Sequence, residues 1–402
     1  MGKLNVKFIA LKKNDIFMQL RNQLALDFLA EYGIHNPEIV TAIDQVRNDS
    51  PNRNPIEIVK DCFSGKTLPD ALVSLAEIND PDLAQNYDSF DEAAKKQLKI
   101  KVLHCLKMNR QLLWLRRLES FTCAKINDII EQEKGRLVNN GETTLNIVAL
   151  PEFYFIDIND NEKHKDDIVN YSKPFYFDNI KTLLRDSDDH TAPSLASLTI
   201  DENIILLPGT AIWKQINQDD HLQETLFNTL PIFFNGKLQM AWDKVNTSTI
   251  DGFYDESDIL KKNKVPSSYR STPSLLTPQS CSMTDPLYSY PVKLSDGTNS
   301  TITIGFDICL DFLFENLKSL NTEPMIHILI AAGMPVSSNA DKIYAKNLFL
   351  RCDGGGDATR GDGDNECYIV DLNTPGVFKQ ANNISANDLF DVFNETIDIT
   401  SN

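Results

Sequence analysis

The sequence TITIGFDICLDFLFENL, residues 301–317, contains the junction that decides the fold. Its β-branched run predicts a strand that ends at Ile308, and the apolar spacing after Cys309 predicts a helix. A side chain at a strand-to-helix junction lies at the sheet edge where α/β proteins place their clefts. Cys309 is therefore either a packed core residue or a nucleophile presented to a cleft.

Apolar strands and amphipathic helices also alternate upstream of this junction. Residues 99–107 suit a strand, 109–134 a long amphipathic helix and 143–155 a second, buried strand, which together predict a β-α-β opening of an α/β fold. Asn235-Gly236 between two apolar runs predicts a hairpin with a type I′ turn. Lys244 then lies on or just beyond the outgoing strand.

Three stretches fall outside this pattern. Residues 1–95 have helix-like apolar spacing and predict a helical N-terminal region. Residues 246–288 are rich in Ser, Thr, Pro, Asp and Tyr and predict a long surface insertion or lid. Residues 351–367 (RCDGGGDATRGDGDNEC) lack the ending of a phosphate loop and the spacing of a calcium loop, so they predict an acidic loop near the cleft.

Composition and charge narrow the class of protein. The 402 residues are 42% hydrophobic and 24% charged, as in soluble globular proteins. A net charge of −18 disfavours nucleic acid as a partner. No segment has the roughly 18 uninterrupted apolar residues of a membrane-spanning helix, so no membrane partner is expected.

The cysteines and the first residues bear on the compartment. Seven cysteines without a CxxC pair argue against a disulfide framework and a structural zinc site. The first residues show no cleavable signal peptide. A cytoplasmic location is expected, and secretion without a cleavable signal remains open.

Three polar residues follow predicted strands: Glu152, Lys244 and Cys309. Taken singly, each has an ordinary explanation as a solvated loop residue, a surface lysine and a core thiol. Taken together, they supply what a nucleophilic thiol needs, which is a base and a positively charged neighbour. A helix starting after the cysteine would add positive potential at the sulfur.

The segments that carry these residues resemble the three motifs of the nitrilase, or carbon-nitrogen hydrolase, superfamily. VALPEFYF (148–155) resembles the motif that ends in Pro-Glu and places Glu152. NTLPIFFNGKLQMAWDK (228–244) resembles the Asn-containing strand, Gly-Lys-Leu turn and lysine, and places Lys244. IGFDICLDFLF (304–314) resembles the nucleophile motif and places Cys309 with Gly305, Asp311 and Phe314. Three ordered motifs are far more specific than any one of them.

The resemblance covers residues 98–395, for which it implies an αββα four-layer sandwich, and it does not extend to the helical region 1–95 expected from the apolar spacing. It implies hydrolysis of a non-peptide C-N bond through a thioester, with Cys309 as nucleophile and Glu152 as base and then acid. Lys244 and the backbone N–H of Leu310 would face the oxyanion. Glu256 is the candidate for the family's frequent second carboxylate, with a surface-loop position as the alternative. No cofactor and no metal are implied.

Two departures from the family pattern stand out. Glu315 and Asn316 replace the family's usual Pro-Glu after Phe314, and the 246–288 insertion is longer than usual. A catalytically silent binding protein and an acyltransferase that uses the same triad therefore remain as alternatives. The expected partners are a small amide-type substrate, a second copy of the chain in a homodimer, and a protein bound through residues 1–95.

Overall fold

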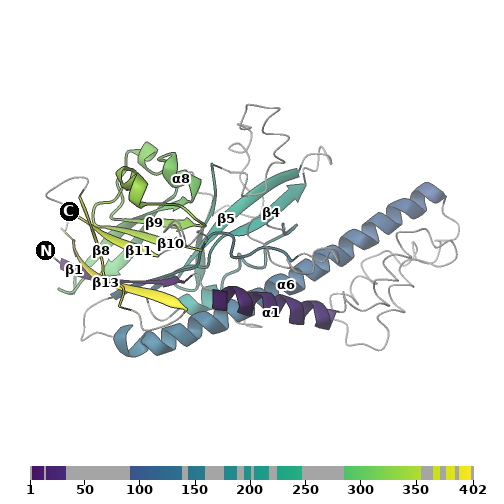
Figure 1. Ribbon diagram of the computed structural model, residues 1–402, viewed down its shortest axis with the longest axis horizontal. Helices are drawn as coiled ribbons and strands as arrows, with labels where there is room; N and C mark the ends of the chain where they lie inside the picture. Colours follow the sequence, from purple (N-terminus) through teal and green to yellow (C-terminus); the bar gives the residue numbers. More distant parts are fainter. Residues whose placement is uncertain are drawn as a thin grey trace. The chain divides into compact units, whose positions relative to one another are not determined.

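The computed structural model describes residues 2–12, 15–32, 91–137, 144–158, 176–187, 194–200, 203–216, 224–246, 285–354, 365–371, 377–384 and 389–399. These residues belong to two compact units. The first comprises residues 1–21, 118–157 and 169–402, and the second comprises residues 22–117 and 158–168. The described strands lie in the first unit, which also holds the three candidate residues (Figure 1).

The first sheet has seven strands in the order β13-β1-β2-β3-β5-β4, with β6 paired to β5. β1, β2 and β3 run parallel, and β13, β5, β4 and β6 pair antiparallel. The strands are β1 (Gly2–Leu11), β2 (Thr144–Ala149), β3 (Ile204–Leu207), β4 (Ala211–Ile216), β5 (Glu224–Phe234), β6 (Lys237–Asp243) and β13 (Phe390–Ile399).

The second sheet has six strands in the order β12-β11-β10-β9-β8-β7. Its centre is the parallel set β8, β9 and β10, and the remaining strands pair antiparallel. The strands are β7 (Leu287–Lys293), β8 (Asn299–Ile308), β9 (Ile326–Ala331), β10 (Leu348–Asp353), β11 (Glu366–Val370) and β12 (Phe378–Gln380).

One hydrophobic cluster fills the space between the sheets. Alternate residues of β1 (Leu4, Val6, Phe8) share this cluster with alternate residues of β8, including Ile304 and Phe306. The opposite face of the second sheet carries a smaller cluster in which strand residues pack against Phe312 of the short helix α8 (Leu310–Leu313). The chain is thus a mixed α/β protein with two sheets packed face to face, as the sequence predicts.

The described part of the chain also contains two long α-helices and three short 3-10 segments. They are α1 (Asp15–Tyr32), α6 (Glu92–Leu137), η3 (Ala196–Thr199), η7 (Lys318–Leu320) and η8 (Ser337–Lys342). The C-terminal part of α6 belongs to the first unit, where the hydroxyl of Thr122 lies 3.0 Å from that of Tyr154 just beyond β2. Among the described residues, no helix is long and apolar enough to cross a membrane.

The N-terminal residues differ from the prediction. A helical region over 1–95 is wrong for Gly2–Leu11, which form the buried strand β1 between β2 and β13. Lysines at positions 3 and 7 interrupt the apolar run, but only Lys3 is exposed, because Lys7 is buried and Val6 and Phe8 enter the core. α1 begins only at Asp15. Most of residues 33–90 lie outside the described part of the chain.

The strand predicted for residues 99–107 is also wrong, because these residues lie inside α6. No glycine or proline occurs between Glu92 and Lys134, so nothing ends the helix across this stretch. The expected domain boundary between residues 95 and 98 falls within the same helix. The Asn235-Gly236 hairpin is confirmed: φ is 52° at Asn235 and 71° at Gly236, and the two residues join β5 to β6.

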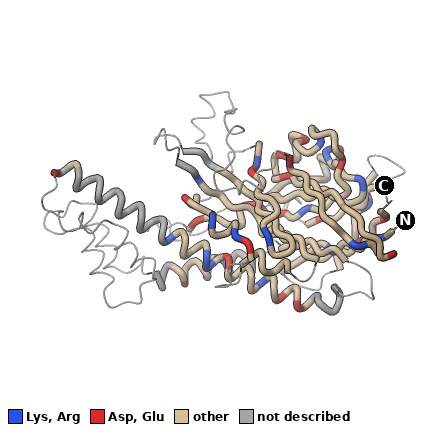
Figure 2. The backbone as a smooth tube through the Cα atoms, turned by 180° about the vertical axis from the view of Figure 1, so that it is seen from behind, with Lys and Arg blue, Asp and Glu red and all other residues tan. Residues whose placement is uncertain are grey.

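Charged residues are interspersed along the described chain. Figure 2 shows Lys and Arg (blue) and Asp and Glu (red) scattered along the described chain between stretches of uncharged residues (tan).

The place of β1 in the core leads to a first prediction. Phe8 is 1% exposed and stacks on Phe393 with 6.1 Å between ring centroids. Phe8→Ala should therefore lower the free energy of unfolding by about 3–5 kcal/mol, the usual cost of an emptied aromatic site. Urea denaturation measures the loss, with Lys3→Ala as the exposed control on the same strand. A loss below about 1 kcal/mol would place β1 outside the core.

Candidate active site

Glu152 lies in the turn after β2, which ends at Ala149, and its side chain is fully buried. The next residue, Phe153, has a φ of 58°, a left-handed conformation that is costly for a bulky side chain. Gly209 makes room for this turn, because a Cβ atom there would lie 2.4 Å from the carbonyl oxygen of Pro151. The close approach holds the backbone around Glu152 in one conformation.

Lys244 forms a buried ion pair with Glu152. Its Nζ lies 2.7 Å from Oε1 of Glu152, and the two side chains are 1% and 0% exposed. Asn228, on β5, donates from Nδ2 to the same oxygen at 2.9 Å, and its carbonyl accepts the Lys244 backbone N–H at 2.9 Å. The hairpin predicted from Asn235-Gly236 thus delivers both partners of the carboxylate.

Cys309 lies at the corner between β8 and α8. Its φ of 49° and ψ of −105° are unusual for a residue other than glycine. The side chain is half-buried and packs against both hydrophobic clusters. The backbone angles of Cys309 are thus an outlier at the end of a strand. A strained strand-to-helix turn that exposes a side chain is the geometry expected of a nucleophile.

Asp311 joins the cysteine corner to the lysine loop. Its carboxylate accepts the backbone N–H of Asn246 at 2.7 Å and that of Val245 at 3.2 Å, so it holds the two residues after Lys244. Asp311 itself is two residues after Cys309 and is fully buried. This clamp ties the loop after β6 of the first sheet to the turn after β8 of the second sheet, next to Cys309.

Two neighbouring carbonyl groups at the end of β9 join the cysteine corner to the glutamate. The oxygen of Ile330 accepts the Cys309 N–H at 2.9 Å, and the oxygen of Ala331 accepts the Glu152 N–H at 3.3 Å. Glu152, Lys244 and Cys309 therefore lie on three loops that are tied to one another by hydrogen bonds. The sequence placed each of them after a strand, and the structure does so too.

Leu310 is the first residue of α8, and the hydrogen bonds of this turn run from Phe312 N to Cys309 O and from Phe314 N to Leu310 O. The backbone N–H of a first helical residue is not used within the helix. The apolar helix expected after Cys309 is only this single turn, and Glu315, just beyond it, takes a φ of 53°.

The second carboxylate candidate, Glu256, and nearly all of the expected 246–288 insertion lie outside the described residues. Leu287 and Tyr288, at the end of that stretch, belong to β7. Gly305 of the nucleophile motif lies under Leu317, since a Cβ atom at Gly305 would be 2.6 Å from a Leu317 methyl group.

Asp311 has an unusual proton affinity. Burial raises its pKa to about 7, and the nearby carboxylate of Asp307 adds to the shift. The backbone N–H groups of Asn246 and Val245 and the charge of Lys244 oppose it. Near neutral pH the clamp therefore carries less negative charge than an ordinary aspartate.

His327 forms a second buried pair next to this site. Its Nε2 lies 3.0 Å from Oδ2 of Asp307, and the backbone N–H of Tyr344 donates to Nδ1 at 3.3 Å. Because Nδ1 accepts a hydrogen bond, the ring proton sits on Nε2 and points at Asp307. His327 is fully buried, and each of its ring nitrogens has a hydrogen-bond partner.

Sequence reasoning missed several of these side chains. Asn228 stands in the quoted Asn-containing strand, but its contact with Glu152 depends on two strands meeting 76 residues apart. Asp307 precedes the cysteine by two residues, and only the strand alternation could have marked it as facing away from Ile308. Among the described residues, no group of three or more His, Cys, Asp and Glu side chains is arranged to hold a metal ion.

In comparisons with known proteins, the chain is similar only to solved structures. No family model and no curated protein matches the chain. Glutamine-dependent NAD+ synthetase from Acinetobacter baumannii is 13% identical with a TM-score of 0.33, and the match covers 69% of this chain and 42% of that one. The C. elegans NitFhit protein is 17% identical with a TM-score of 0.34, over 69% of this chain and 57% of that one.

An N-terminal amidase solved with a Gln-Val peptide is 12% identical with a TM-score of 0.27, and the match covers 52% of this chain and 43% of that one. The chain spans less than two thirds of the length of each of these proteins. At these TM-scores the likenesses decide nothing about the activity of the chain.

The buried ion pair can be tested through stability. Lys244→Met leaves Glu152 buried without its cation, and this should cost about 3–5 kcal/mol of unfolding free energy. Adding Glu152→Gln to Lys244→Met should recover part of that loss, because the double variant no longer buries an uncompensated charge. Urea denaturation of the two single variants and the double variant gives the coupling. Additive losses would show that the two side chains do not interact.

The shifted Asp311 predicts a pH dependence with a definite sign. An unfolded aspartate loses its proton near pH 3.9, whereas folded Asp311 keeps it up to about pH 7. The folded state binds more protons in this window, so stability falls as pH rises through it. Asp311→Asn should flatten the fall, and urea midpoints at several pH values measure it.

Asp243 supplies the comparison for that experiment. Burial raises its pKa to about 6, so it contributes a slope of the same sign that Asp311→Asn leaves in place. A slope in the Asp311→Asn variant equal to that of the wild type would contradict the assignment.

Proposed function

We propose that the chain is a cysteine-dependent hydrolase of a non-peptide C-N bond, in an amide, a nitrile or a carbamoyl group, that works through a thioester. The observation that carries the proposal is the fully buried Lys244–Glu152 pair on a loop tied to the strained Cys309 corner. Burying two charges costs several kcal/mol each, and such pairs seldom add stability. A pair kept at this cost beside a half-buried thiol supports a chemical role.

For an amide or carbamoyl substrate, Glu152 takes the proton from Sγ of Cys309 in the first half-reaction, and the sulfur attacks the substrate carbonyl carbon. The oxygen becomes an anion that faces Nζ of Lys244 and the backbone N–H of Leu310. Collapse of this intermediate breaks the C-N bond, and protonated Glu152 gives its proton to the leaving amine. The acyl group remains on sulfur as a thioester.

In the second half-reaction Glu152 takes a proton from water, which attacks the thioester carbonyl. The C-S bond breaks, and the carboxylic acid leaves as the thiol regains its proton. Lys244 serves both halves by stabilising the oxyanion, and one such donor is typically worth about 2.7–4 kcal/mol of barrier. Its hydrogen bond to Oε1 also orients the carboxylate.

Selective alkylation tests the proposal. Labelling with iodoacetamide is measured by intact mass at several pH values between about 5 and 9. We expect one thiol to be labelled quickly at neutral pH, and we expect this label to be absent in Cys309→Ala. Cys123, Cys352 and Cys367 serve as internal controls, because they are buried and burial raises the pKa of each thiol. Glu152→Gln should slow the labelling of Cys309.

Two outcomes separate the alternatives. Labelling of Cys309 no faster than the buried thiols would contradict the catalytic proposal and favour a silent binding protein. Fast labelling together with turnover of an amide opens a comparison of products: free acid indicates hydrolysis, and a new amide formed with an added amine indicates acyl transfer.

A further inference from the structure

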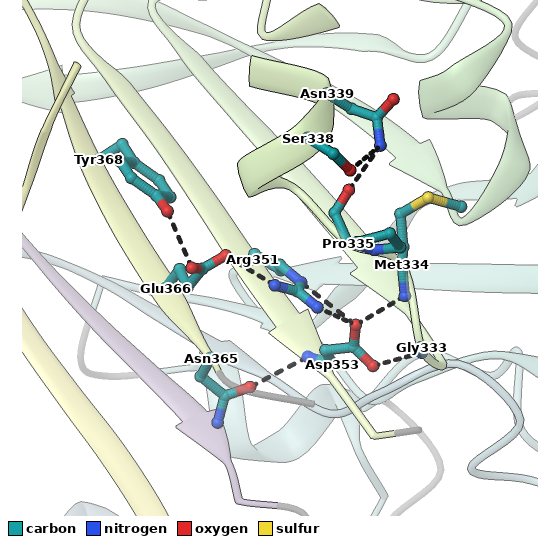
Figure 3. Close-up of polar contacts among 10 residues, drawn as sticks. All are labelled: Gly333, Met334, Pro335, Ser338, Asn339, Arg351, Asp353, Asn365, Glu366 and Tyr368. Atoms are coloured by element: carbon teal, nitrogen blue, oxygen red, sulfur yellow. Dashed lines mark hydrogen bonds and ion pairs between the residues drawn. The ribbon is translucent and has the colours of Figure 1, made fainter. Parts of the chain in front are cut away.

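A ladder of polar side chains crosses the second sheet and ends at the turn after β9 (Figure 3). Tyr368 donates from its hydroxyl to Glu366 at 2.8 Å, and Glu366 accepts from Nη1 of Arg351 at 2.7 Å. Arg351 also pairs with Asp353 on the same strand. Asp353 then accepts the backbone N–H of Gly333 at 2.6 Å and that of Met334 at 3.0 Å.

The charged members of this ladder are buried at a cost. Arg351 is 1% exposed and Asp353 is 0% exposed. A well-packed apolar pair in their place would serve stability equally well or better. The carboxylate has one use that an apolar residue cannot supply, because it satisfies two consecutive backbone N–H groups of a turn in which Gly333 has a φ of 96°.

That turn is tied to Glu152. The Ala331 carbonyl oxygen, two residues before Gly333, accepts both the Glu152 N–H at 3.3 Å and the Gly354 N–H at 3.0 Å. A Cβ atom on Gly354 would lie 2.3 Å from Cβ of Pro151, so the residue after Asp353 packs directly against the residue before Glu152.

A second contact lies on the other side of Asp353 and joins β10 to β2. Sγ of Cys352 lies 3.4 Å from the Ala149 carbonyl oxygen, so β10 and β2 approach each other on either side of Asp353. Asp353 is therefore fixed between the turn that bonds Glu152 and the strand end that packs on it.

We propose that Asp353 is a positioning residue that sets the backbone of Glu152 by holding the turn Gly333–Met334, with Arg351 neutralising its charge. This inference rests on the proposed function for its catalytic meaning, since Glu152 is the base there. It adds a residue from a strand that carries none of the three motif residues.

The test compares Asp353→Asn with Glu366→Gln. Both variants remove one carboxylate charge from Arg351, but only Asp353→Asn places an NH₂ group against one of the two turn N–H groups. Hydrogen exchange of the full chain should be about tenfold faster in Asp353→Asn for the peptide containing Glu152 and for the peptide containing Gly333, and unchanged there in Glu366→Gln. The alkylation-pH profile of Cys309 should move toward that of Glu152→Gln in Asp353→Asn alone.

The outcomes separate this inference from the proposed function. Wild-type Cys309 labelling at the rate of a buried thiol would remove the catalytic role, while the exchange comparison would still decide whether Asp353 holds Glu152. Faster exchange at Gly333 without any change at Glu152 would overturn the positioning role. If Asp353→Asn does not fold, Asp353→Glu gives the same comparison, because its longer side chain keeps the charge and displaces the oxygens from the turn.

Discussion

The end of β9 is the constraint on which the candidate site depends. Two consecutive carbonyl groups there, those of Ile330 and Ala331, accept the backbone N–H groups of Cys309 and Glu152. Cys309 follows a strand of the second sheet and Glu152 follows a strand of the first. One short segment of backbone therefore joins the two sheets at the point where the Glu152 and Cys309 side chains leave them, and any movement of this segment changes the separation of these side chains.

The core between the sheets makes that arrangement rigid. Its members come from the inward faces of both sheets, so each sheet covers the apolar face of the other. β1 lies between β2 and β13, and it supplies Leu4, Val6 and Phe8 to the same cluster. The strand that carries Glu152 to the site thus has a buried parallel neighbour on each side, β1 and β3.

Local patterns in the sequence predict the parts of this fold that are encoded locally. The Asn235-Gly236 turn and the strand before Cys309 depend on neighbouring residues or on strand alternation, and the structure has both. β1 could not be found in this way, because its partners β2 and β13 are distant in the chain and the lysines within it suggest a surface segment. Residues 99–107 alternate like a strand, but they lie inside an uninterrupted helix.

The same distinction applies to the site. The motif order marks Glu152, Lys244 and Cys309. The pattern of residues 351–367 predicts only an acidic loop around Asp353, because nothing in the adjacent sequence shows that its carboxylate reaches the Gly333–Met334 turn. Contacts of this kind between separate loops follow from the tertiary structure and leave no period or spacing in the sequence.

The charges around Cys309 form one coupled set. Lys244 pairs with Glu152 and also lowers the pKa of Asp311, so a single ammonium group faces two buried carboxyl groups. Burial holds the proton on Asp311 up to about pH 7, which limits the negative charge near the cysteine. A thiolate at Cys309 would be a further negative charge two residues away, so its formation and the ionisation of Asp311 oppose each other. Under the proposed function, the proton affinity of the thiol is a property of the whole set of groups, and Asp311 as well as Glu152 would determine how readily the sulfur becomes a nucleophile.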